Sequence, residues 1–148
     1  MKSNKIFLLF LLPCFLFFAQ IGNSAPAPGN APEVFAPNPI KKIIKAIEKA
    51  NIFVLETPAQ PSPLVIEQEK NYLLLSRLAT SDELEDLILT HKNAVVRMYA
   101  FKALTIQMNN ISENIMNVIN NDTTLIDCIN KEKSEMAEIK ILAQNFLN

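Results

Sequence analysis

Apolar residues after residue 39 recur with the spacing of α-helices. In residues 40–47, for example, four isoleucines stand at positions i, i+3, i+4 and i+7, with lysines between them, which is the stripe of an amphipathic helix. Both glycines of the chain lie before residue 30, so the tight turns of β-hairpins lack their usual residue, and no convincing pair of alternating strands is found. The pattern therefore predicts an all-α domain over residues 40–148.

The first 24 residues (1–24) have the three-part pattern of a secretory signal peptide. Two lysines precede an apolar run at residues 6–19, and a polar segment with small residues follows it. Cleavage is expected between Ser24 and Ala25, which would make the mature protein secreted or periplasmic. The alternative is an uncleaved membrane anchor, but the run is shorter than the roughly 20 apolar residues that span a bilayer, and Pro13 interrupts it.

Residues 25–39 are interpreted as a Pro/Ala-rich linker. They contain most of the prolines after the signal segment, and proline does not continue a helix, so the linker is predicted to be extended. Cleavage of the signal peptide would also remove Cys14. Cys128, expected in a helix, would then be the only thiol, so no intramolecular disulfide can form and the fold must depend on packing.

Residues 81–104 are predicted to form a helical hairpin. Thr80 and Glu83 have the spacing of a capping box at the start of its first helix, and Asn93 can cap the second helix. The first helix presents leucines, whereas the second presents small alanines. Because small residues opposite large ones let helices approach closely, the two helices are expected to pack against each other.

The second of these helices resembles the second helix of a HEAT repeat. The family pattern V-R-x-x-A-x-x-A-L matches five residues of this chain: Val96, Arg97, Ala100, Ala103 and Leu104. By that resemblance these residues are structural, and Arg97 would reach along the stack to hydrogen-bond turn residues of a neighbouring repeat. The preceding turn departs from the family, because His91 and Lys92 occupy positions usually filled by Asp and Pro.

A second, degenerate repeat is expected near the C-terminus, because residues 138–147 align with residues 95–104 at a constant offset. Two repeats alone bury too little surface to be stable, so helices at 40–52 and 65–79 are predicted to pack on the array. The fold class expected is all-α, a short HEAT-like α-solenoid of antiparallel helix pairs with an N-terminal helical cap. In these features the chain resembles a short exported bacterial HEAT-repeat domain protein.

No motif for catalysis or cofactor binding is found in the sequence. The chain lacks G-x-S-x-G, P-loop, H-E-x-x-H and G-x-G-x-x-G patterns. His91 is its only histidine, and a metal site usually needs several converging ligands. We expect a protein that is not an enzyme, with no catalytic, cofactor-binding or metal-binding residues. The formal net charge of −1 argues against a nucleic-acid partner.

HEAT-type arrays present a continuous helical surface to proteins or peptides, so the resemblance implies an exported protein-binding or scaffold module. The candidate partner surface consists of Glu85, Asp86, Arg97 and Lys102. The alternative function is a membrane-peripheral module, held by an uncleaved N-terminal anchor and by the basic amphipathic helix 40–49 lying on lipid. The partner's identity and the oligomeric state stay open.

Overall fold

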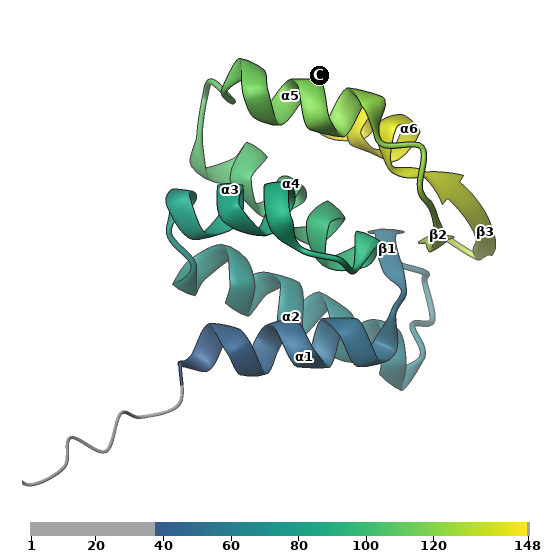
Figure 1. The fold of residues 1–148 in the computed structure, drawn as a ribbon. Helices are drawn as coiled ribbons and strands as arrows, with labels where there is room; N and C mark the ends of the chain where they lie inside the picture. The colour runs from purple at the N-terminus through teal and green to yellow at the C-terminus, as the bar shows by residue number, and fades with distance from the viewer. Residues whose placement is uncertain (1–37, 148) are drawn as a thin grey trace, which may run out of the picture. The chain divides into compact units, whose positions relative to one another are not determined.

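The structure is a computed structural model, and it describes residues 38–147 (Figure 1). The predicted signal peptide, and the predicted linker up to residue 37, lie outside the described residues. The described elements are α1 (Pro39–Ala50), β1 (Phe53–Glu56), α2 (Pro63–Leu78), α3 (Ser81–Thr90), α4 (Ala94–Gln107), α5 (Glu113–Asn121), β2 (Leu125–Asn130), β3 (Lys133–Glu138), α6 (Ile139–Ala143) and the 3₁₀ turn η1 (Gln144–Phe146).

The prediction of an all-α solenoid is wrong, because the described part of the chain contains a three-stranded sheet. The strand order is β1-β2-β3, with β1 parallel to β2 and β2 antiparallel to β3. The β2–β3 hairpin occupies residues that were expected to connect the helices of a second repeat. Up to residue 147, only the short α6 and the turn η1 follow it. The α3–α4 pair is therefore not repeated.

The hairpin forms without glycine because Lys131 takes the left-handed conformation at the turn, with φ of 53°. In β2, the side chains of Ile126 and Cys128 are buried, whereas Leu125 and Asp127 are exposed. This alternation is the signature of a strand with one buried face, but it covers too few residues to stand out from the helical pattern around it. Cys128 accordingly lies in a strand, with its side chain buried.

The predicted helical hairpin is confirmed by α3 and α4, which pack against each other. The capping box is also confirmed: the Glu83 N–H donates to Thr80 Oγ1 at 3.2 Å, and the Thr80 N–H donates to Glu83 Oε2 at 2.9 Å. The side chain of Asn93 caps α4 as predicted. The residues on the inner face of α4 are fully buried: Val96, Tyr99, Ala100, Ala103 and Leu104.

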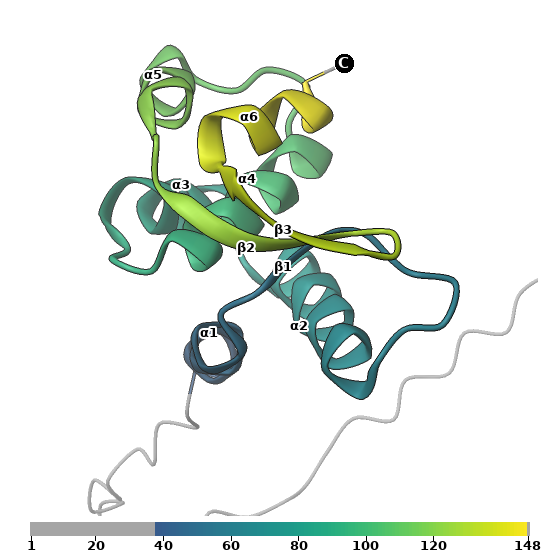
Figure 2. The same cartoon turned by 90° about the vertical axis from the view of Figure 1, so that its right-hand side faces the viewer.

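α1 and α2 lie side by side and form a layer below α3 and α4 in Figure 1. Figure 2 shows the same two helices below the sheet and α4. The isoleucines Ile40, Ile43 and Ile47 of α1 are buried, as the spacing predicts. In α2, Leu78 is 48% exposed, whereas Tyr72 is buried. None of the helices within residues 38–147 is long and apolar enough to cross a bilayer.

Candidate functional site

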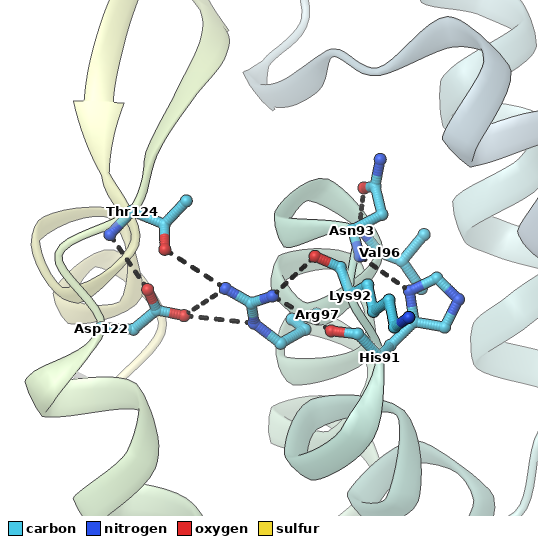
Figure 3. A network of polar contacts seen from close by, with 7 residues as sticks. All are labelled: His91, Lys92, Asn93, Val96, Arg97, Asp122 and Thr124. Atoms are coloured by element: carbon cyan, nitrogen blue, oxygen red, sulfur yellow. Dashed lines mark hydrogen bonds and ion pairs between the residues drawn. The ribbon is translucent and has the colours of Figure 1, made fainter.

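Arg97 lies where α4 meets the connection between α5 and β2 (Figure 3). Its Nε and Nη2 atoms donate to Asp122 Oδ2 at 3.1 and 2.7 Å, and its Nη1 donates to the carbonyl oxygens of His91 and Lys92 at 3.0 and 3.1 Å. Nη2 also donates to the Thr124 hydroxyl oxygen at 3.4 Å. One guanidinium therefore ties the α3–α4 turn to the C-terminal end of α5, and all five of its N–H groups have an acceptor.

Asp122 is held in its ionised form by this network. Its side chain is only 11% exposed, and burial alone would raise the pKa of the carboxyl group. Hydrogen bonds from Thr124 and Arg97, together with the charge of Arg97, outweigh that effect and hold the pKa below its ordinary value. The Arg97 side chain is 15% exposed, so the donor capacity of this residue is used inside the fold.

His91 joins the α3–α4 turn to α1. Its Nδ1 accepts a hydrogen bond from the Asn93 N–H at 3.2 Å, and its Nε2 lies 3.5 Å from Glu48 Oε1. The Asn93 side chain donates to Asn51 Oδ1 at 2.9 Å, which links the same elements a second time. Within residues 38–147 no three His, Cys, Asp or Glu side chains gather as metal ligands would.

The Lys102 amine points into the domain, toward the outer edge of β1. Its Nζ donates to the Val54 carbonyl oxygen at 3.1 Å. It also lies over three aromatic rings, 4.4 Å from the centroid of Tyr72, 5.6 Å from Phe53 and 5.7 Å from Phe146. Burial is the largest influence on this amine and lowers the pKa of Lys102. The three π-faces stabilise the charged form in this enclosed position.

Tyr99 completes the closure of the β1 edge. Its hydroxyl oxygen accepts a hydrogen bond from the Val54 N–H at 2.9 Å. Both backbone groups of Val54 are therefore bonded to side chains of α4, one to Tyr99 and one to Lys102. Burial raises the pKa of Tyr99, so the hydroxyl stays protonated. A fourth strand would need these backbone groups, so this edge of the sheet is closed.

The opposite edge of the sheet is formed by β3 and is open. Residues 133–136 are exposed, and within the described residues the only strand that pairs with β3 is β2. The two-residue turn makes Asn130 and Lys133 a hydrogen-bonded pair. Alternation along β3 then directs the backbone N–H and C=O groups of Ser134 and Met136 away from β2. These groups are free to pair with an added strand.

The four residues of the candidate partner surface do not gather on one surface. Arg97 and Lys102 bond inside the fold, while Glu85 is half-buried and Asp86 exposed on α3. Asp86 lines a shallow groove of about 190 Å³ between α1 and α3. The β3 edge was not expected, because its sequence lacks an apolar alternation of its own and only β2 carries that signal.

Comparisons of the chain with protein-family models, curated proteins and solved structures find no match. The resemblance to a HEAT-repeat helix therefore depends on the five matching residues of α4 alone. Function is consequently inferred from the geometry of the chain itself.

Proposed function

We propose that the chain is an exported, non-enzymatic module that binds another protein by adding an extended segment of that partner to the open edge of β3. The observation that carries this proposal is the difference between the two edges of the sheet. β1 is closed by Tyr99 and Lys102, whereas the backbone of β3 is exposed. In strand addition, backbone hydrogen bonds give affinity and side-chain contacts give specificity. Export is supported by the signal pattern of residues 1–24.

The outer face of the sheet beside this edge indicates what the partner segment carries. Met136 is 57% exposed and Leu125 is 56% exposed, and the two are diagonal neighbours on one face of the β2–β3 pair. A partner strand covers them best with apolar side chains at every second position. The exposed charges of Lys133 and Glu135 lie on the other face, where they disfavour unselective pairing of a short edge strand.

The test is site-specific photo-crosslinking in the source cells. A photoreactive residue replaces Leu125, and a matched control carries it at Asn117, which is exposed on α5. We expect one adduct with a different protein from position 125 and none from position 117. In the same background, Met136→Pro removes an outward N–H but no hydrogen bond to β2. It should reduce the adduct yield at least tenfold, whereas Met136→Leu should not.

Three results would contradict the proposal. The first is equal crosslinking from both positions, and the second is an unchanged adduct yield in Met136→Pro. The third is an adduct with the mass of two copies of this chain, because the proposed occupant is another protein. Circular dichroism of each variant checks that the fold is retained, so that a loss of crosslinking reports on the edge.

A further inference from the structure

The layer formed by α1 and α2 carries unpaired positive charge on its outer side. The solvent-facing side of α1 holds four exposed lysines within an arc of about 100°, opposite the buried isoleucines; they are Lys41, Lys42, Lys45 and Lys49. On α2, which lies beside α1 in both views, the exposed side chains include Lys70 and Arg77 (Figures 1 and 2). Six cations therefore face solvent from two adjacent helices.

Exposed apolar side chains lie among the cations of α2. Ile66 is 56% exposed and Leu73 is 47% exposed, and both line an open cavity of about 440 Å³ together with Lys70 and Arg77. Large apolar side chains surrounded by polar ones are a common mark of an interaction surface. Here the surrounding charge is mostly positive.

α1 and α2 carry three acids against these six cations, so the layer keeps a net positive charge. Within residues 38–147 none of the six cations takes part in an ion pair. Glu48 Oε1 lies 3.5 Å from His91 Nε2, a contact that is an ion pair only when the histidine is protonated. Glu83 and Asp86 of α3 line a groove in which Lys41 is the only one of the six cations. On α2, Glu67 is exposed, and Glu69 lines the cavity with Lys70 and Arg77 and also acts on the half-buried Lys102.

We propose that this α1–α2 face binds the surface of an anionic membrane. Lysines attract anionic headgroups without needing a defined geometry, and Ile66 and Leu73 can enter the headgroup layer beside Lys70 and Arg77. The apolar side of α1 takes no part, because Ile40, Ile43 and Ile47 are buried in the domain. This differs from a helix that places its apolar face on lipid. The proposal is independent of strand addition at β3, which uses another part of the surface.

The expected strength follows from the number of cations. One lysine near an anionic surface contributes about a fivefold increase in partition coefficient. Replacing Lys45 and Lys49 by glutamine should therefore weaken binding about 25-fold. Glutamine is nearly as good a helix former as lysine, and both positions are exposed, so the fold should be retained.

The test is sedimentation of the full chain with vesicles of phosphatidylcholine alone and with 30 mol% phosphatidylglycerol added. The apolar run at residues 6–19 is the same in every variant, so its contribution cancels in ratios between variants. The matched control is Lys131→Gln with Lys133→Gln, which removes the same charge from the exposed β2–β3 hairpin. Leu73→Ser tests the apolar side chain.

We expect the Lys45/Lys49 variant to lose about 25-fold in binding to anionic vesicles. The hairpin control should lose less than about threefold, and Leu73→Ser should weaken binding at constant charge. Raising the salt to 0.5 M should abolish the preference for anionic vesicles, because the screening length then falls to a few Å. Equal binding to neutral and anionic vesicles would overturn the proposal. So would equal losses in the α1 variant and the hairpin control.

Discussion

Replacing Arg97 by methionine should lower the free energy of unfolding by about 3 kcal/mol. The change removes both hydrogen bonds to Asp122, both bonds to the α3–α4 turn and the bond to Thr124. It leaves the Asp122 carboxylate, 11% exposed, without its cation. Breaking a fully buried pair in this way costs about 3–5 kcal/mol. The remaining exposure of Asp122 lets water reach the carboxylate, so the expected loss of stability is at the lower end of this range.

The pH dependence provides an internal check on this estimate. The folded state lowers the pKa of Asp122, so the ionised carboxylate stabilises the fold above the ordinary carboxyl pKa of about 4, and this contribution is lost as the pH falls through the folded pKa. Arg97→Met removes a main cause of the lowered pKa. The difference in unfolding free energy between wild type and variant should therefore be largest near neutral pH and narrow in acid.

Urea unfolding followed by far-UV circular dichroism at pH 7 and pH 3 measures both effects. Lys140→Met is the matched control, because the Lys140–Glu138 pair has a 2.7 Å contact but side chains that are 39% and 31% exposed. Such a surface pair contributes at most about 1 kcal/mol. The reasoning is refuted if the two variants lose equal stability, or if the loss in Arg97→Met is the same at both pH values.

Three further predictions concern the core around α4. Tyr99→Phe leaves the buried Val54 N–H without its acceptor, so thermal or urea unfolding should show a loss of about 1–3 kcal/mol. Ala103→Leu forces a large side chain into a fully buried position, which should cost about 1–3 kcal/mol in the same assay. Cys128 is fully buried, and burial raises the pKa of its thiol to about 11. In a Cys14→Ser background, the thiol should react with Ellman's reagent at pH 8 only when urea unfolds the domain; rapid reaction in native buffer would contradict this.

Local signals in the sequence were sufficient for α3 and α4 and for their N-terminal caps. The capping box of Thr80 and Glu83 and the cap at Asn93 each depend on residues within one turn, so a short window of sequence contains all the information. The sheet depends on pairs that are distant in the sequence, such as Phe53 with Cys128. β1 has only four residues and no alternating pattern that would identify it. The turn also uses Lys131 in a conformation that glycine or asparagine usually supplies.

The directions in which the Arg97 and Lys102 side chains point could not be predicted from the spacing of residues in the sequence. Both are cations on α4, and a helical wheel separates buried from exposed positions only in relation to known neighbours. Asp122, which binds Arg97, lies at the end of α5. Val54, which binds Lys102, lies in β1. Both contacts join residues that are distant in the sequence, so a short window of sequence shows neither of them.

The HEAT-like pattern of α4 accounts for the packing of this helix against α3. The fold also depends on the other contacts of α4, above all those with β1. Buried small residues such as Ala100 and Ala103 suit a close partner helix, and α3 packs there. Tyr99 and Lys102 bond β1 where a solenoid would continue with another helix pair. Because that bonding closes the β1 edge, a further strand can be added to the described sheet only at β3. The strand that packs on α2 is β1 (Figure 2). A protein held on a membrane by the α1–α2 face would therefore keep its β3 edge accessible. Vesicle-bound protein should then crosslink to its partner protein from position 125 as efficiently as free protein does.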